Sequence, residues 1–174
     1  MTNARRSILI VGILLTLSLL FAGANAQSVA TSKTSPPVFA AFQAGTALSL
    51  SNAQLIYPEE LVKTLKTPKG EKPLILQIGP RVLYDQAHIP GSEYIAAGSS
   101  EAGKQQLRKR VQSLPHGKFI VLYCGCCPWS HCPNVAPAYQ QLNAMGFTNV
   151  KALYIANNFG ADWVDKGYPV AKGN

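Results

Sequence analysis

The stretch that decides the fold is KFIVLYCGCCPWSHCPN, residues 118–134. Its first seven residues form an apolar run with β-branched and aromatic side chains, which predicts a buried strand over 118–124. The segment 135–145 is predicted to be a helix, with Asn134 as N-cap, Pro137 in the first turn and Gly146 at its end. The loop between them therefore joins the carboxyl end of a strand to the start of a helix, where α/β proteins form their binding sites.

Strand and helix patterns alternate on both sides of this stretch. Residues 57–66 predict a helix that begins at Pro58, and residues 84–98 predict a turn-rich connection. The remaining patterns are a strand over 73–79, a helix over 101–114, a strand over 149–155 and a helix over 159–168. This alternation predicts an α/β fold with a mostly parallel central sheet flanked by helices.

The N-terminus has the pattern of a secretory signal peptide. Arg5 and Arg6 precede an apolar run over 8–22 and a small-residue site at Ala24 and Ala26, which predicts a cleaved signal peptide over 1–26. Residues 27–52 are rich in Ser, Thr and Ala and are expected to form a flexible N-terminal arm, and 53–174 one domain. The protein is thus expected to be exported, to the periplasm or the extracellular space, with membrane contact only through the uncleaved signal peptide.

The charge of the chain gives no sign of a nucleic-acid partner. The formal charge is +8, and removing the two signal-peptide arginines lowers it to +6. The only basic cluster is LRKR, residues 107–110, and no aromatic side chains or binding motif accompany it. This pattern favours a solvated helix face, and no nucleic acid is expected to bind.

All four cysteines of the chain lie in the loop, within residues 124–132. Cys124 comes between a strand end and a helix N-terminus, where free backbone N–H groups and the helix dipole favour a thiolate. The same amides, from residues 125–130, are expected to form a cradle for an anion. The sequence therefore predicts that Cys124 is a nucleophile.

Four short motifs occur in one order along the chain: PEEL (58–61), AHIPGS (87–92), IVLYC (120–124) and WVDKGYPV (163–170). In these motifs the sequence resembles the rhodanese-like family, over roughly residues 53–171. The resemblance implies a rhodanese-like fold and favours an enzyme, a sulfurtransferase in which Cys124 takes a sulfane sulfur from a donor such as thiosulfate. The resulting persulfide would pass its sulfur to a nucleophilic acceptor. A domain that has lost catalysis and only binds stays open.

The resemblance also implies which partners and residues take part. Partners would be a small sulfur-containing anion or a thiol acceptor, together with a protein that exchanges sulfur or redox equivalents, and no cofactor is needed. The substrate-binding loop would consist of Gly125, Cys126, Cys127, Pro128, Trp129, Ser130 and His131.

The sequence departs from the family at the site. Gln77 and Gly79 stand where the family has an acidic residue and an arginine, and the loop contains no Arg or Lys. His131 is the only candidate cation, and an ordinary histidine is mostly neutral near pH 7. These departures weigh against efficient use of thiosulfate.

Aromatic residues and one further histidine have structural interpretations. Trp129 either walls a pocket or packs on the domain, and both interpretations stay open. His88 is expected to organise its turn by hydrogen bonding, and Trp163 and Tyr168 to pack under the C-terminal helix.

Two other hypotheses fit the same loop. Cys124 and Cys127 have C-x-x-C spacing, which is typical of thiol–disulfide redox proteins and would make Cys127 the resolving thiol. Alternatively, the loop offers ligands for Zn(II) or Cu(I), namely Cys124, Cys126, Cys127, Cys132 and His131. A local disulfide between Cys127 and Cys132, which would only shape the loop, is compatible with sulfur transfer, redox exchange or metal binding.

Overall fold

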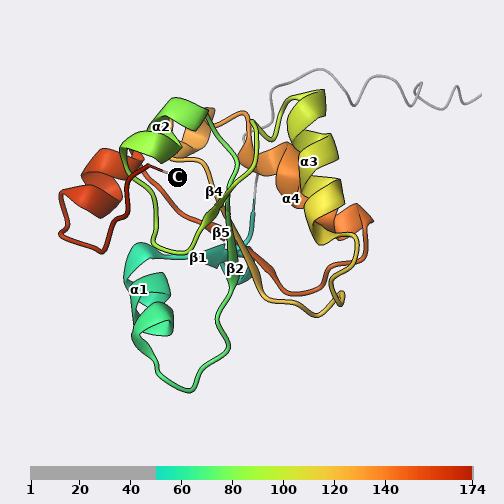
Figure 1. The fold of residues 1–174 in the computed structure, drawn as a ribbon, viewed down its shortest axis with the longest axis horizontal. Coiled ribbons are helices and arrows are strands. Elements are labelled where there is room, and N and C mark those ends of the chain that lie inside the picture. The colour runs from blue at the N-terminus through green and yellow to red at the C-terminus, as the bar shows by residue number, and fades with distance from the viewer. Residues whose placement is uncertain (1–49, 174) are drawn as a thin grey trace, which may run out of the picture. The chain divides into compact units, whose positions relative to one another are not determined.

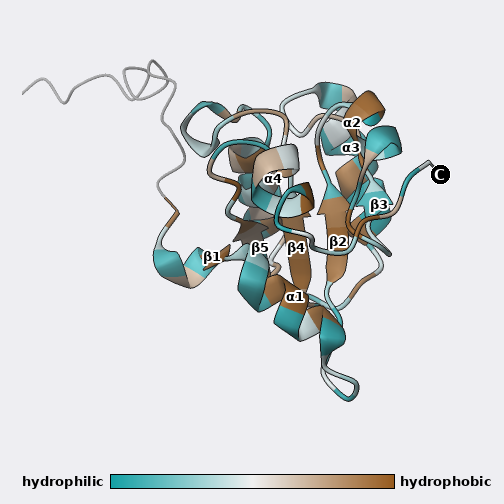
Figure 2. Cartoon of the chain, turned by 90° about the vertical axis from the view of Figure 1, so that its left-hand side faces the viewer, coloured by the Kyte–Doolittle hydropathy of each residue, from teal (hydrophilic) through white to brown (hydrophobic). Residues whose placement is uncertain are grey.

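A computed structural model describes residues 50–173, and the predicted signal peptide and most of the predicted arm lie outside this range. The central sheet, drawn with its surrounding helices in Figure 1, has five parallel strands in the order β1-β5-β4-β2-β3, and their labels follow this order across Figure 2. Their bounds are β1 Leu55–Ile56, β2 Leu74–Gln77, β3 Glu93–Tyr94, β4 Ile120–Tyr123 and β5 Val150–Leu153. The predicted α/β fold with a parallel central sheet is confirmed, and β4, which leads into the cysteine loop, is the central strand.

Within residues 50–173, four α-helices and three short helical turns accompany the strands. The helices are α1 Pro58–Lys66, α2 Arg81–Gln86, α3 Glu101–Val111 and α4 Val135–Ala144. The turns are the 3₁₀ turns η2 Asn52–Gln54 and η3 Trp129–His131 and the π-helical turn η4 Gly160–Val164. Pro58 begins α1 as predicted, and Gly146 ends α4 at φ +87°, a left-handed conformation that only glycine adopts without strain. The helix predicted over 159–168 is reduced to η4 and following turns.

Successive residues of β4 point into two separate core layers. Ile120 and Leu122 pack with apolar side chains of α3 and α4, whereas Val121 and Tyr123 pack with those of α1 and η4. Figure 2 shows the apolar strands β2 and β4 between helices. Because both faces of β4 are covered, its sequence is continuously apolar instead of alternating. Cys124 continues the alternation and lies in the layer formed with α3 and α4.

Helix length and hydropathy also bear on membranes. Within residues 50–173, the structure contains no helix that is both long enough and apolar enough to cross a bilayer.

The predicted turn-rich connection over 84–98 contains the end of α2 and the two-residue strand β3, both too short to produce a periodic sequence pattern. His88 donates from Nδ1 to the Tyr84 carbonyl at 2.8 Å and stacks on the Tyr84 ring at 3.9 Å. The hydroxyl of Tyr123 accepts the N–H of Ile89 at 3.2 Å. His88 therefore organises its turn, as predicted, and Tyr123 fastens this turn to the central strand.

The basic cluster over 107–110 is divided between the core and solvent. Leu107 is buried, whereas Arg108 and Lys109 are exposed. Arg110 donates from Nη2 to Glu93 Oε1 at 2.7 Å, which joins α3 to β3. The cluster is thus largely a solvated helix face, as predicted from its sequence.

The C-terminal aromatic residues pack as predicted. Trp163 is fully buried and donates from Nε1 to the Pro169 carbonyl at 2.8 Å, so its one polar atom is satisfied. The Tyr168 hydroxyl donates to Glu59 Oε1 at 3.1 Å.

Candidate functional site

Cys124 directly follows β4, and the adjacent strand β2 shapes its surroundings. The side chain of Gln77 donates from Nε2 to the Cys124 carbonyl at 3.4 Å, and its Oε1 accepts the N–H of Gly79 at 3.2 Å. A Cβ atom added at Gly79 would lie 2.8 Å from Cys124 Sγ. The two departures from the family in β2 and just after it therefore fit this cysteine: Gln77 holds its backbone and Gly79 leaves room for its sulfur.

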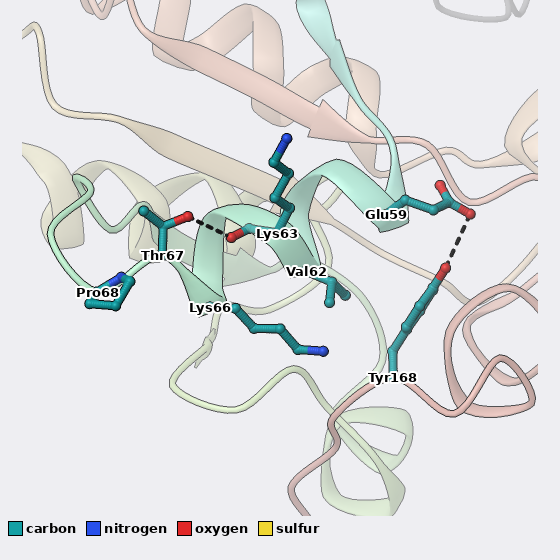
Figure 3. A pocket seen from close by; sticks show the side chains of 7 residues that line it. All are labelled: Glu59, Val62, Lys63, Lys66, Thr67, Pro68 and Tyr168. Atoms are coloured by element: carbon teal, nitrogen blue, oxygen red, sulfur yellow. Dashed lines mark hydrogen bonds between the residues drawn. The ribbon is translucent and has the colours of Figure 1, made fainter.

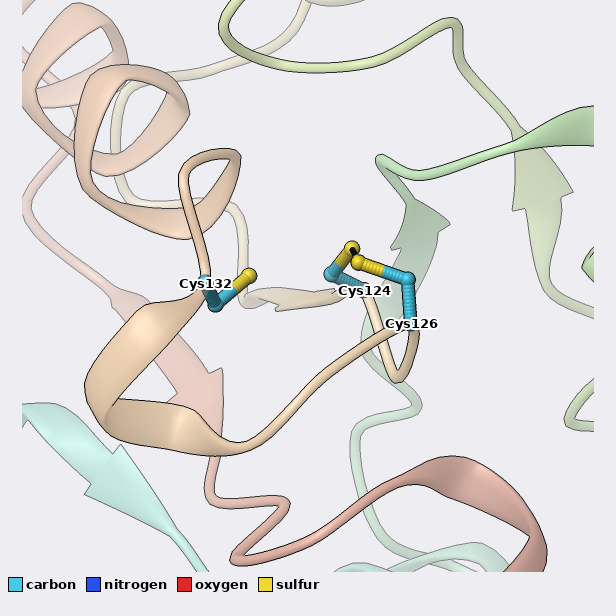
Figure 4. Close-up of side chains that lie close together, drawn as sticks. All are labelled: Cys124, Cys126 and Cys132. Carbon is cyan, nitrogen blue, oxygen red and sulfur yellow. Dashed lines mark hydrogen bonds between the residues drawn. The ribbon is translucent and has the colours of Figure 1, made fainter.

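Three of the four sulfur atoms form a group. The Sγ atoms of Cys124, Cys126 and Cys132 all lie within 4.8 Å of one another, and those of Cys124 and Cys126 are 3.1 Å apart (Figure 4). Gly125 makes this possible, because at φ +72° it turns the chain back on itself, and a Cβ there would be 2.6 Å from Phe159. The 3₁₀ turn η3 then returns the chain so that Cys132 faces Cys124. We call Cys124, Cys126 and Cys132 the three-thiol cluster.

Cys127 and His131 lie outside the three-thiol cluster. The Sγ of Cys127 is 3.1 Å from that of Cys126, and its thiol donates to the His131 carbonyl at 3.7 Å. The ring Nδ1 of His131 is 2.9 Å from Ser130 Oγ on the exposed side of the loop. The structure thus brings Cys126 and Cys132 next to Cys124, in place of the predicted partner Cys127.

The lowered thiol pKa belongs to Cys132. Its pKa falls to about 6 because the Cys124 thiol donates to it, an effect that outweighs its burial, and because the backbone N–H groups of Asn134 and Val135 also point to it. The hydrogen bond to Cys132 and burial raise the pKa of Cys124 well above its usual range. Burial and the neighbouring Cys126 raise the pKa of Cys127 to about 12.

These directions correct the expectation of a thiolate on Cys124. The long loop places Cys132, and not Cys124, directly before α4, so Cys132 receives the free N–H groups of the helix N-terminus. Cys124 is only 3% exposed and holds its proton against Cys132. The electrostatics of the loop therefore favour a negative charge on Cys132 over one on Cys124.

Asn134 has a different role from the predicted helix cap. It occupies the N-cap position of α4, but its backbone is α-helical (φ −95°, ψ −35°) and its side chain makes no capping hydrogen bond. Instead Nδ2 donates to Cys124 Sγ at 3.3 Å, and Oδ1 accepts the Ser99 hydroxyl and N–H at 2.8 and 3.2 Å. Sequence reasoning missed this contact, because nothing in a capping pattern distinguishes an amide that turns back toward a preceding strand.

The predicted cradle of loop amides over 125–130 is smaller than expected. Pro128 has no N–H, and the N–H of Trp129 donates to the Ala156 carbonyl at 3.1 Å. An anion at this loop would draw on the amides of Gly125, Cys126, Cys127 and Ser130. Both interpretations of Trp129 hold, because its ring packs against Tyr154 at 5.3 Å and also lines the space beside Cys124.

Two cavities adjoin the loop. The first, about 10 Å³, lies against Cys124, Cys127, Trp129 and Cys132 and has room for one water molecule at most. The second, about 400 Å³, is lined by Gly125, Cys126 and Phe159 with residues of α2 and η4. Within the described part of the chain, neither cavity is lined by Lys or Arg. A small molecule can therefore reach Cys126 more readily than Cys124, and it meets no cationic side chain there.

Another cavity lies against α1, and none of the cysteines lines it. It measures about 580 Å³ and is lined by Glu59, Val62, Lys63, Lys66, Thr67, Pro68 and Tyr168 (Figure 3). It contains no nucleophile or metal-ligating cluster, so the cysteine loop remains the candidate site.

Comparisons with known proteins agree with this architecture. The Rhodanese-like domain family matches residues 58–154. Among solved structures, the BH2092 protein from Bacillus halodurans is 19% identical with a TM-score of 0.52, over 68% of this chain and 76% of that chain. The Alr3790 protein from Anabaena sp. is 19% identical with a TM-score of 0.52, over 68% of this chain and 92% of that chain.

A thiosulfate sulfurtransferase from Pseudomonas aeruginosa is 22% identical with a TM-score of 0.51, over 69% of this chain but 19% of that chain. These identities establish a shared fold, and the comparison with curated proteins found no match. The family match covers more than half of the sequence and includes β4 and the cysteine that follows it. The chain therefore belongs to the rhodanese-like domain family.

Proposed function

We propose that this protein transfers or carries sulfane sulfur through a persulfide on Cys124. The observation that carries the proposal is the position of Cys124 at the carboxyl end of the central parallel strand, inside a loop of four thiols. Rhodanese-like sulfurtransferases use sulfur donors and acceptors in general. Membership of this family and the location of the cysteine together support the sulfurtransferase assignment.

The neighbouring thiolate of Cys132 supplies a base for the first step. Cys132 accepts the proton of the Cys124 thiol as the Cys124 sulfur attacks the outer sulfur of a donor R–S–SH. The S–S bond of the donor breaks, a new S–S bond forms on Cys124, and the leaving thiolate takes up the proton as R–SH. An acceptor thiolate then attacks the outer sulfur of the persulfide and the S–S bond to Cys124 breaks. The acceptor leaves as a persulfide anion, and the proton of the persulfide passes to Cys124, which returns to its thiol form.

The surroundings of the loop favour a donor that carries little charge. Thiosulfate is a dianion, and burial of a dianion without a cationic partner is unfavourable. Neither cavity beside the loop is lined by Lys or Arg within the described residues, and the loop itself contains neither residue type. A low-molecular-weight persulfide is therefore the proposed donor and a thiol the proposed acceptor, outside the cytoplasm if the N-terminal segment directs export.

Proximity within the three-thiol cluster favours a second function, thiol–disulfide exchange. Cys124 and either neighbour in the cluster could form a disulfide while a partner disulfide is reduced to two thiols, so that two electrons pass from the loop to the partner. The observation that favours this function is the 3.1 Å separation of the Cys124 and Cys126 sulfurs.

A steady-state assay separates these functions. Sulfur transfer to cyanide, measured as thiocyanate, is compared for glutathione persulfide and thiosulfate as donors, with the wild type and the Cys124→Ser variant. We expect transfer from glutathione persulfide at a rate above that from thiosulfate, and only background transfer in Cys124→Ser, since serine is a far poorer nucleophile. Reversible oxidation by a disulfide without any transfer from either donor would support the exchange function and refute sulfur transfer.

A further inference from the structure

We propose that the three-thiol cluster, Cys124, Cys126 and Cys132, is a binding site for one Cu(I) ion. This inference goes beyond the sulfur-transfer proposal and does not depend on it, because it concerns the ligands of the loop and not its nucleophilicity. Thiolate sulfur is a soft ligand, and sites of several thiolates select Cu(I) or Zn(II) over hard cations.

The spacing of the sulfurs suits a planar three-coordinate ion. With a metal–sulfur bond of about 2.3 Å, three sulfurs at the corners of an equilateral triangle are about 4.0 Å apart. In the structure all three separations are within 4.8 Å, and the shortest, between Cys124 and Cys126, is 3.1 Å. Binding therefore requires that this pair open by about 0.9 Å and that a separation near the 4.8 Å limit close by about 0.8 Å, changes within the reach of the side-chain torsions.

The number of ligands favours Cu(I) over Zn(II). Structural zinc sites are almost always tetrahedral with four protein ligands. Within residues 50–173, the sulfur group around Cys124 has three members. Cys127 Sγ lies 3.1 Å from Cys126 Sγ and is hydrogen-bonded with Cys132, but it does not belong to the group that includes Cys124, and its thiol donates to the His131 carbonyl. The His131 ring nitrogen Nδ1 is engaged with Ser130. The five ligands that the sequence offered are thus reduced to three.

The surroundings of the cluster suit a buried ion. Asn134 donates from Nδ2 to Cys124 Sγ at 3.3 Å, which is the kind of outer hydrogen bond that orients a ligand. Val135, Leu153 and Ile155 line the small cavity beside the cluster and limit access of water. A buried thiolate is stable when it is paired with a cation, and no Lys or Arg occurs from residue 124 to residue 134 to serve as one.

Binding exchanges protons for metal–sulfur bonds. Each thiol that becomes a ligand loses its proton to solvent and gains a bond to Cu(I), and no atom changes oxidation state because copper is supplied already reduced.

The test is a titration of the fully reduced, full-length protein with Cu(I) held by the chromophoric chelator bicinchoninate, under anaerobic conditions. We expect one equivalent of Cu(I) to leave the chelator, and native mass spectrometry to show one copper per chain. Alkylation of the loaded protein should then modify Cys127 and spare the other three cysteines.

Matched variants locate the site. Cys126→Ser should weaken Cu(I) binding at least tenfold, whereas Cys127→Ser, the adjacent residue with the same substitution, should leave the affinity unchanged. Circular dichroism verifies that both variants are folded. Equal weakening by both substitutions, no transfer from the chelator to the wild type, or a stronger preference for Zn(II) with four protected thiols would overturn the proposal.

The copper measurement contains no sulfur donor, so it is independent of the sulfur-transfer proposal. Persulfide formation without copper binding would refute only the metal site, and copper binding without persulfide formation would refute only the proposed function.

Discussion

Substitution of Gly79 by alanine should strain the protein specifically at Cys124. The added Cβ would lie 2.8 Å from Cys124 Sγ, 2.9 Å from Gln77 Nε2 and 3.3 Å from the Cys124 carbonyl oxygen. Ordinary van der Waals contact begins near 3.4 Å, so the sulfur would have to retreat by about 0.6 Å. Its path is limited, because Cys126 Sγ is 3.1 Å away and Asn134 Nδ2 is 3.3 Å away.

Overpacking of a well-packed core typically destabilises a protein by about 1–3 kcal/mol. For a urea dependence of about 2 kcal/mol per molar, a loss of 2 kcal/mol lowers the unfolding midpoint by about 1 M. Equilibrium urea unfolding, followed by circular dichroism, measures this shift. The expected midpoint of Gly79→Ala is therefore about 0.5–1.5 M below that of the wild type.

Gly117→Ala is the matched control, because a Cβ at Gly117 has no neighbour within 4 Å and its backbone is not left-handed. We expect its free energy of unfolding to change by less than about 0.5 kcal/mol. If Gly79→Ala were as stable as Gly117→Ala, the close approach of Gly79 to Cys124 would be wrong, and with it the argument that glycine is needed beside this sulfur.

Three further predictions test the ion pair, the amide and the thiolate. The pKa of Glu93 is lowered by its hydrogen bond to Arg110, so the pair stabilises the fold above the unfolded-state pKa and loses this effect as the pH falls through the folded-state value. Because the carboxylate is 44% exposed, Glu93→Gln should cost only about 0.5 kcal/mol at pH 7 and nothing in acid, in urea titrations at both pH values. Asn134→Ala should cost about 1–3 kcal/mol by urea unfolding, because it removes the three hydrogen bonds of a buried amide, to Cys124 Sγ and to the hydroxyl and N–H of Ser99, and a change below 0.5 kcal/mol would contradict this. In the reduced, metal-free protein, alkylation of Cys132 should rise with pH and reach half of its maximal rate near pH 6, whereas a midpoint near 9 would place the thiolate elsewhere.

The sequence predicted the parts of the fold that have long, consistent patterns. The apolar run over 118–124 and the helix from Pro58 succeeded, because burial on both faces and capping are local signals. The strands Leu55–Ile56 and Glu93–Tyr94 were missed, since two residues form no period and their pairing depends on neighbours distant in the sequence.

The sequence predicted which loop forms the candidate site, but it did not predict which cysteine of the loop has the lowered pKa. Cys124 was located correctly after the strand, but the helix amides were assigned to it because it came first. A signal for Cys132 was present in the sequence: the residues Cys132, Pro133 and Asn134 directly precede the predicted helix start, which is where N–H groups are free. The turn of Asn134 toward Cys124 depends on tertiary packing, and no local pattern encodes it.

The most direct test of the central claim is the location of transferred sulfur. The reduced protein is incubated with glutathione persulfide, alkylated, and measured by intact mass and peptide mapping, beside Cys124→Ser. The account predicts a gain of one sulfur atom on Cys124 in the wild type and none in the variant. Sulfur mapped to Cys126 or Cys132 in the wild type, or undiminished loading of Cys124→Ser, would show that Cys124 is not the sulfur carrier.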